Sequence, residues 1–442
     1  MTDNELRILK NSTQYLKNGF FAAEDKAQNT LRTTENILME VADKMRNNYP
    51  YHHPLYAGQM LKPPHPVAKL AYALAMEINP NNHALDGSKA SSPMEKEAVS
   101  QLAEMFGYDT HIGHLTSSGT IANLEALWVA GQLHPEKRIL ASELAHYTHN
   151  RISSVLKLPF AEVKADLYGR MDVSDLTELL HKGDVGTVVV TLGTTGTGSV
   201  DPLEDILQLQ KEFDFRIHID AAYGGYFKLA EVLDQDTMRH FSRMAQADSI
   251  VIDPHKHGLQ PYGCGCILFK DPGIGKLYSH DSPYTYFTSD DLHLGEISLE
   301  CSRSGAAAVA LWATLKQFPL VRNGKMAAGL DNCHKAAVNL FEKIDQDPDF
   351  IILIPPETDI VVWTPTGDSA SAISQQSKAM FEACAEKGLH LALLNYPVNL
   401  LPEHWQKIRK DQEFVTCLRS CLMKWEHNDW IDKIWDIIQS TK

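Results

Sequence analysis

The segment that decides the fold is VIDPHKHG, Val251 to Gly258, taken together with RIHIDAAYGG, Arg216 to Gly225, which precedes it. Each segment is a short apolar run that stops at charged or imidazole side chains and is followed by glycine. That pattern is typical of a buried strand that presents functional groups at its carboxyl end. One run ends in Asp220, and the other ends in His255 and Lys256. Two strands that simply meet solvent would produce the same pattern, so the chemistry of these side chains has to decide.

Lys256, Asp220 and a nearby imidazole form a combination that suits pyridoxal 5'-phosphate. A lysine directly after an apolar strand is costly to bury unless it is paired or used chemically. With this cofactor, an amine binds the aldehyde carbon covalently, a carboxylate keeps the pyridine nitrogen protonated, and a ring stacks on the pyridine. We therefore expect pyridoxal 5'-phosphate to bind where these two strands end.

The composition is that of an ordinary globular protein, because 44% of the 442 residues are hydrophobic and 22% are charged. The formal net charge of -15 argues against nucleic-acid partners and anionic membrane surfaces. No apolar stretch reaches the roughly 18 to 20 residues that would span a bilayer, and the start, MTDNELRILKNSTQ, lacks the pattern of a secretory signal. Seven scattered cysteines without a CxxC pair predict reduced thiols, no metal site and a cytoplasmic location.

From about residue 111 to residue 270, short apolar runs alternate with helical segments. This alternation predicts an α/β fold with a mostly parallel sheet and helices on both faces. The expected strands are RILAS, TVVVTLGT, FRIHID, SIVIDP and CGCILFK. Near Asn323 the pattern changes, and later strands (FIILIP, DIVVWTP and FVTCLRSCLM) interleave with helices. We therefore expect a helical N-terminal segment over residues 1–80, a large cofactor-binding domain over 81–320 and a small α+β domain over 321–442.

A candidate phosphate-binding turn lies in HLTSSGTIANLEALWVAG, His114 to Gly131. Ser118, Gly119 and Thr120 come at the start of a predicted helix, where backbone N–H groups and hydroxyls would face a phosphate. The same residues would also suit an ordinary N-cap turn, so the pattern alone leaves both interpretations open.

Two further strand ends carry candidate cofactor contacts. His146 follows RILAS and would stack on the pyridine ring or act in acid–base catalysis, although a loop histidine is the alternative and His149 lies close by. Thr194 and Thr195 supply hydroxyls in TLGTTGTGSVDP, a Gly/Thr turn that is also common for structural reasons.

Four segments, SSGTIANLEAL, SELAH, IHIDAAYGG and DPHKHG, resemble the group II pyridoxal-phosphate-dependent decarboxylases. The resemblance extends through HPLYAGQML, SPMEKEAVSQLAEMFGY and LECSRSGAAAVALW, and spans about residues 50 to 315. It implies the type I, aspartate-aminotransferase-like fold and a homodimer whose active site lies at the subunit interface, with residues 1–80 helping to form the dimer. Within the family, HPLYAGQML, NPNNHA and HKHGLQPYG are most similar to the bacterial tyrosine decarboxylases.

The resemblance implies a role for each matching residue of the cofactor site. Lys256 corresponds to the lysine that holds the cofactor covalently, and His255 to the neighbouring histidine that contacts the phosphate. Asp220 corresponds to the partner of the pyridine nitrogen, and Ala222 to the small residue beneath the ring. His146 corresponds to the histidine that stacks on the ring.

Further positions follow from the same resemblance. The turn Ser118–Thr120 corresponds to the phosphate-binding turn, and Thr195 is expected to contact the cofactor. His83 and Tyr262 correspond to residues that face the substrate, and Ser302 to a residue that approaches the site from the partner subunit. Asp253 stands where many members carry asparagine or serine, and since an acid there would repel phosphate, we expect it to point away from the site.

The reaction that the resemblance implies is the release of carbon dioxide and an amine from an L-amino acid, with an aromatic substrate such as L-tyrosine favoured. Tyr262 is the first candidate for the group that delivers a proton to the product carbon. Tyr284 and Tyr286, in the loop SPYTYFTSDD, are the alternatives.

Three other functions compete with this one. Glutamate or aspartate is the nearest rival substrate, since Gln59, His83 and Arg303 could bind a distal carboxylate. A carbon–carbon lyase similar to the sphingosine-phosphate lyases would need extra basic residues for a substrate phosphate, and the site segments offer few. A non-catalytic binding protein is disfavoured because the lysine, aspartate and histidine set is complete.

Overall fold

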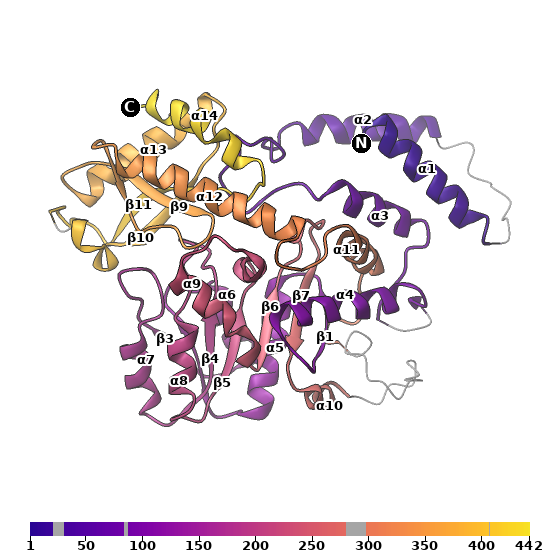
Figure 1. Ribbon diagram of the computed structural model, residues 1–442, viewed down its shortest axis with the longest axis horizontal. Coiled ribbons are helices and arrows are strands. Elements are labelled where there is room, and N and C mark those ends of the chain that lie inside the picture. The colour runs from indigo at the N-terminus through magenta and orange to yellow at the C-terminus, as the bar shows by residue number, and fades with distance from the viewer. Residues whose placement is uncertain (21–30, 84–86, 280–297, 406) are drawn as a thin grey trace.

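The computed structural model describes residues 1–20, 31–83, 87–279, 298–405 and 407–442 (Figure 1). A seven-stranded sheet lies at its centre with the strand order β1-β7-β6-β5-β4-β2-β3. The pairs β2–β3, β2–β4, β4–β5 and β5–β6 are parallel, whereas β7 runs antiparallel to β1 and β6. The strands are β1 (Ile112–Thr116), β2 (Arg138–Ser142), β3 (Phe160–Val163), β4 (Val185–Thr191), β5 (Arg216–Asp220), β6 (Ser249–Ile252) and β7 (Gly265–Phe269).

Helices cover both faces of this sheet, so the predicted α/β layering is confirmed. In β4, Val188 and Val190 pack into the core on one face, while Val189 packs into the core on the other. Strands buried on both faces are apolar at consecutive positions, which explains runs such as TVVV. The first face is covered by α4 (Ser91–Phe106), α7 (Val173–Leu180), α8 (Leu203–Leu209), α9 (Gln235–Ser242) and α11 (Gly305–Gln317), and the second by α5 (Gly119–Leu133), α6 (Thr148–Leu156) and α10 (Gly275–Tyr278).

The four-residue strand β3 was not among the expected strands. Strand β1 was not expected either, because Gly113 and His114 interrupt its apolar pattern. The strand is nevertheless buried along its length and pairs with β7. A Cβ atom on Gly113 would lie 2.4 Å from the carbonyl oxygen of Ile267, so glycine permits the close approach of these two strands. The interruption is therefore a packing requirement rather than the end of an element.

A second, antiparallel sheet has the order β10-β11-β9-β8. Its strands are β8 (Phe350–Ile352), β9 (Ile360–Pro365), β10 (Ala392–Pro397) and β11 (Phe414–Cys421), of which β10 was not expected. One face packs against α12 (Lys325–Asp345), α13 (Ala370–Glu386) and α14 (His427–Gln439). The other face packs against Ala165 and Tyr223 of the large-sheet region. The small sheet thus lies directly beside the end of β5.

Helix α12, which follows the predicted domain boundary at residue 320, contributes to the cores of both sheets. The first turns of α12 contribute Met326 and Leu330 to the core of the large sheet, and its later turns contribute Leu340 and Ile344 to that of the small sheet. The division at residue 320 therefore stays a prediction.

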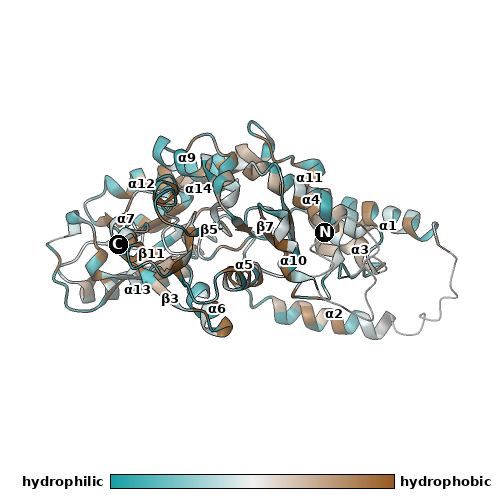
Figure 2. Ribbon diagram, turned by 90° about the horizontal axis from the view of Figure 1, so that it is seen from below, coloured by the Kyte–Doolittle hydropathy of each residue, from teal (hydrophilic) through white to brown (hydrophobic). Residues whose placement is uncertain are grey.

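The N-terminal region contains α1 (Asp3–Lys17), α2 (Leu31–Met45) and α3 (Pro66–Met76). Helix α3 packs against α11, whereas the segment after α2 is joined to the small sheet, since the Ala57 carbonyl accepts from Cys421 N at 2.7 Å. Helix α2 lies apart from the body of the protein (Figure 2). Its apolar side chains Ile37, Leu38 and Met45 are each more than half exposed. Among the described residues, no helix has the length and apolar character needed to cross a membrane.

Candidate active site

The carboxyl ends of β4, β5 and β6 meet the start of α5 around a cavity of about 150 Å³. Its lining includes nine residues that the sequence placed at the cofactor, namely Ser118, Gly119, Thr120, His146, Thr195, Asp220, Ala222, His255 and Lys256. It also includes Asn123, Thr148, Thr191, Gly193, Tyr223 and Asp253, which the sequence had not placed there. The strand ends that carry Asp220 and Lys256 therefore converge on one cavity.

Asp220, the last residue of β5, is buried and receives hydrogen bonds from three protein donors. Its Oδ1 accepts from Ala222 N at 3.1 Å, and its Oδ2 accepts from His149 Nε2 at 2.9 Å and from Asn123 Nδ2 at 3.3 Å. Burial acts to raise the pKa of this carboxyl, but hydrogen bonding and charge from His149, the Ala222 N–H and nearby Lys256 hold its pKa well below the usual range. The site therefore holds an ionised carboxylate.

Asn123 is itself held in place by a chain of hydrogen bonds. His218 Nε2 lies 2.8 Å from Asn123 Oδ1, and His218 Nδ1 lies 2.8 Å from Ser249 Oγ. Burial lowers the pKa of His218 to about 3, so its ring is neutral. Because Asn123 uses its NH2 group on Asp220, His218 must donate through Nε2 and accept from Ser249 through Nδ1. Every donor in this chain thus points towards Asp220.

Lys256 follows β6, and its Nζ lies 3.1 Å from Asp253 Oδ2. His255 Nδ1 donates to the carbonyl of Cys264 at 2.8 Å, while its Nε2 lies 3.5 Å from the same Asp253 oxygen. The expectation that Asp253 points away from the site is wrong: its side chain is buried in the lining of the cavity. The Asp253 carboxylate lies there because it pairs with Lys256, three residues further along the chain.

The start of α5 faces the same cavity. Ser118 is the N-cap, and its side chain accepts from Ile121 N at 3.3 Å. A Cβ atom on Gly119 would lie 2.7 Å from Asp253 Oδ2, so the absence of a side chain keeps this turn open. Free N–H groups at the positive end of a helix of 15 residues suit a phosphate group.

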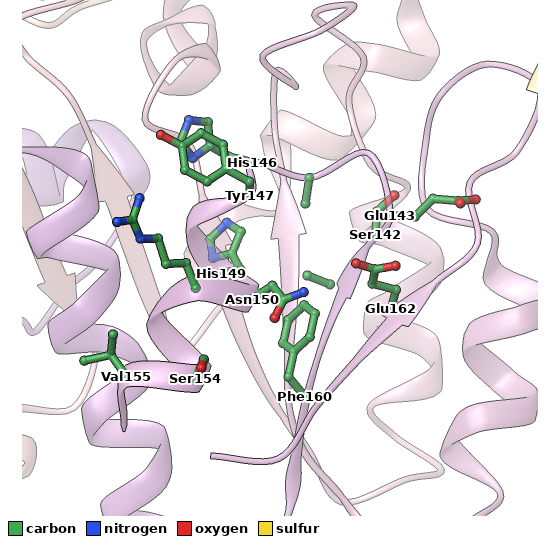
Figure 3. A pocket seen from close by; sticks show the side chains of 13 residues that line it. Ser142, Glu143, His146, Tyr147, His149, Asn150, Ser154, Val155, Phe160 and Glu162 are labelled. Carbon is green, nitrogen blue, oxygen red and sulfur yellow. The ribbon is translucent and has the colours of Figure 1, made fainter. Parts of the chain in front are cut away.

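His146 borders this cavity and lies in the loop between β2 and α6. Figure 3 shows it from a neighbouring cavity that it also lines. Its Nδ1 accepts from Thr148 N at 3.3 Å. Burial lowers the pKa of His146, which favours the neutral ring at neutral pH. A neutral imidazole held in this way can stack on a flat aromatic cofactor.

Tyr262, His83, Ser302 and Thr194 were predicted at the site but do not line this cavity, and Thr194 lines a second cavity instead. The Tyr262 hydroxyl donates to the Met60 carbonyl at 3.0 Å, and its ring lies 4.6 Å from that of His255. Burial raises the pKa of Tyr262 to about 12, so the hydroxyl keeps its proton at neutral pH. His83 and Ser302 lie near one another outside the cavity, because both contact the side chain of Asn81. The Asn81 Oδ1 atom accepts from His83 N at 3.1 Å, and its Nδ2 donates to Ser302 Oγ at 3.3 Å. The alternatives Tyr284 and Tyr286 lie outside the described residues.

Arg419 of β11 is a further candidate residue of the site, which the sequence had not predicted. A second cavity of about 310 Å³ shares His146 and Thr195 with the first, and Arg419 of β11 lines it. Arg419 Nη1 donates to the Thr195 carbonyl at 2.9 Å, and Nη2 donates to Gln59 Oε1 at 2.8 Å. Its Nε is buried without a partner among the described residues. The sequence signal was a cation within the apolar strand FVTCLRSC.

Arg303, which the sequence suggested as a ligand for a distal carboxylate, forms an ion pair with Glu95 instead. Its Nη1 donates to Glu95 Oε1 at 2.8 Å and to the Leu115 carbonyl at 2.7 Å. Both side chains of this ion pair are buried. Arg303 therefore supports the packing of α4 against β1.

The residues of the first cavity fit pyridoxal 5'-phosphate, and the ion pair with Lys256 offsets the charge of the Asp253 carboxylate in the lining. An amine, an ionised carboxylate, a neutral imidazole and an open helix start surround one space, and each matches a different part of this cofactor. The fold and the site together define a pyridoxal-phosphate-dependent enzyme of the type I fold.

Comparisons with known proteins agree with this class. The pyridoxal-dependent decarboxylase conserved domain matches residues 17–364. A probable L-tyrosine/L-aspartate decarboxylase of Methanothermobacter thermautotrophicus is 26% identical over 81% of this chain and 96% of its own. The L-tyrosine decarboxylase of Enterococcus faecium is 30% identical over 64% of this chain and 63% of its own. A crystal structure of Oryza sativa TDC with PLP and tryptamine shares the fold, with a TM-score of 0.78 at 16% identity, over 100% of this chain and 98% of that one.

The chain belongs to the pyridoxal-dependent decarboxylase family. It is a pyridoxal-phosphate-dependent amino acid decarboxylase.

A test of the phosphate turn is Gly119→Ala. We expect the dissociation constant for pyridoxal 5'-phosphate to rise about tenfold or more, because the new Cβ would crowd Asp253 and fill the turn. Titration of the apoprotein with the cofactor, followed by tryptophan fluorescence, measures the effect. Gly196→Ala is the matched control, since a Cβ there would meet Leu394 at an ordinary 3.5 Å. Unchanged cofactor affinity in Gly119→Ala would place the phosphate elsewhere.

Proposed function

We propose that the enzyme decarboxylates an aromatic L-amino acid such as L-tyrosine, with L-aspartate or L-glutamate as the alternative. The observation that carries this proposal is the lining of the second cavity. Leu144, Tyr147, Leu394 and Tyr396 line it together with one guanidinium, that of Arg419. If Arg419 binds the α-carboxylate, the described residues of this lining offer no second arginine for a distal carboxylate. The relatives named for tyrosine and tyrosine/aspartate decarboxylation support the same pair of substrate classes.

The proposed roles follow from where each group lies. When bound, the cofactor supplies an electron sink next to the α-carbon of the amino acid. Lys256 holds the cofactor covalently, and the ionised Asp220 keeps a proton on the pyridine nitrogen. His146 stacks on the ring, and Ala222 leaves room beneath it. Arg419 orients the carboxylate, and that orientation decides which bond at the α-carbon breaks.

The remaining predicted residues are proposed to bind the phosphate or to act on the substrate. Ser118, Gly119 and Thr120 would bind the phosphate at the start of α5, and Thr195 and His255, which line the same cavity, would add further contacts to the cofactor. Tyr262 is the proposed proton donor to the product carbon, and for that role its hydroxyl would have to leave the Met60 carbonyl, to which it donates in this structure.

We also propose that the enzyme is a homodimer. Helix α2 exposes Ile37, Leu38, Val41 and Met45, an apolar set that a second copy of the chain would cover. His83 and Ser302 do not line this chain's own cavity, and in the dimer they reach the cavity of the partner.

The substrate proposal is tested by measuring carbon dioxide release from each of the twenty amino acids with added pyridoxal 5'-phosphate. We expect L-tyrosine to give the highest kcat/KM. In Arg419→Met, KM for that substrate should rise about tenfold to a hundredfold, the effect of one lost charge-assisted hydrogen bond. Arg409→Met is the control, because Arg409 is exposed and pairs with Asp411. A preference for L-aspartate or L-glutamate would contradict the aromatic assignment.

The role of Tyr262 is tested with Tyr262→Phe. We expect carbon dioxide to be released still, while amine release becomes slow, since the variant lacks the hydroxyl that supplies the proton. Carbon dioxide and amine are measured in the same reaction. A one-to-one ratio at a near-normal rate would remove Tyr262 from the reaction.

The dimer is tested with Leu38→Glu. A buried charge in the interface should dissociate the dimer, so the mass by light scattering should fall from about twice 49.4 kDa to 49.4 kDa. Glu40→Gln, on the same helix, is the control and should keep the larger mass. If the unaltered protein already has the mass of one chain, the dimer proposal is wrong.

A further inference from the structure

His149 is a buried histidine on the first turn of α6, close to His146 in the chain, and the sequence predicted no role for it. Its Nε2 lies 2.9 Å from Asp220 Oδ2, and its side chain is 1% exposed. The same residue lines another cavity, of about 530 Å³, which Figure 3 shows from close by. His149 thus lies between the carboxylate of the cofactor site and this neighbouring cavity.

The hydrogen bonds of Asp220 show what His149 contributes. A carboxylate has about four acceptor positions, two on each oxygen. The two on Oδ2 are used by Asn123 and His149, and one on Oδ1 is used by the Ala222 N–H. Among the described residues, this leaves one acceptor position, on Oδ1. Asp220 therefore presents a single oxygen to a proton donor in the cavity.

His149 supplies the shorter of the two hydrogen bonds on Oδ2. Asp220 is ionised and only accepts, so the Nε2 atom of His149 must carry the proton that is shared. The bond from Asn123 is 3.3 Å long, against 2.9 Å for His149. Both bonds go to a charged group, which strengthens them, and the shorter one is the stronger of the two. The orientation of the carboxylate therefore depends on His149 more than on Asn123.

Packing alone does not explain a histidine here. The other ring nitrogen, Nδ1, is buried without a hydrogen-bond partner among the described residues, and such burial costs free energy. An apolar side chain would fill the space without that cost. The contact with Asp220 is the feature that a histidine adds and an apolar residue lacks.

We propose that His149 is a positioning residue of the decarboxylase, which acts by holding Asp220 in one orientation with one oxygen position open to the pyridine nitrogen. The inference rests on the proposed role of Asp220. It predicts that a side chain able to donate from the same place, such as glutamine, can replace the histidine, whereas an apolar side chain of similar size cannot.

The test compares His149→Leu, His149→Gln and Ser153→Ala in the full-length enzyme loaded with pyridoxal 5'-phosphate. His149→Leu should lower kcat about tenfold to a hundredfold and change KM less than about threefold, because the loss affects the alignment of the site rather than substrate binding. It should also change the visible absorption spectrum of the bound cofactor. His149→Gln should recover kcat to within about threefold of the unaltered enzyme. Ser153 is buried one turn further along α6 without contacting Asp220, so Ser153→Ala should leave kcat and the spectrum unchanged.

A double-variant cycle with Asp220→Asn separates this inference from the proposed function. The dissociation constant of the cofactor, from titration of the apoproteins, is measured for both single variants and the double variant. If His149 acts through Asp220, adding His149→Leu to Asp220→Asn should change this constant less than twofold further. Fully additive effects, or a His149→Leu enzyme with normal kcat and spectrum, would overturn the inference. Normal activity in Asp220→Asn would instead overturn the proposed role of Asp220. If His149→Leu does not fold, a loss of kcat in His149→Gln beyond tenfold would overturn the inference.

Discussion

Burying an ionised carboxylate is costly, and the surroundings of Asp220 are arranged to offset that cost. Its three hydrogen-bond donors come from three different places: the backbone after β5, the first turns of α5 and the first turn of α6. Behind Asn123, His218 and Ser249 of neighbouring strands fix the direction of donation. Because Asn123 and His149 must both stay within hydrogen-bond distance of Asp220, the network constrains where α5 and α6 begin.

The same strand ends also place the amine and the phosphate turn. In a parallel sheet covered on both faces, the strand interiors are closed to ligands, and the carboxyl edge is where polar groups can gather. The strand β6 delivers Lys256 there, and α5 points its positive end into the same cavity. The small sheet adds Arg419 from the side, through a contact with the Thr195 carbonyl. The site is therefore shared between two sheets, although its central groups come from one.

The parts of the fold and site that the sequence predicted are those marked by local patterns. The apolar runs ending at Asp220 and Lys256 are strands because burial on both faces requires consecutive apolar residues. The strands β1, β3 and β10 were missed. Gly113 breaks the pattern of β1 for a close backbone contact, β3 has only four residues of which one is Glu162, and Asn395 breaks the pattern of β10 on a partly exposed edge. Asp253 was misplaced because its pairing with Lys256 is a matter of side-chain direction, which charge type alone does not reveal.

The chemical groups at the strand ends, and with them the cofactor class, could be read from the sequence, because a run of consecutive apolar residues marks a buried strand and the polar residues after it mark its end. The partners of those groups are set by the tertiary structure alone. His149 and Asn123 reach Asp220 across 71 and 97 positions of the chain, and Arg419 reaches Thr195 across 224. Such contacts follow from how helices and sheets pack, and packing depends on the complementary shapes of surfaces far apart in the chain. The identity of Asp220 was therefore visible in the sequence, while its orientation was not.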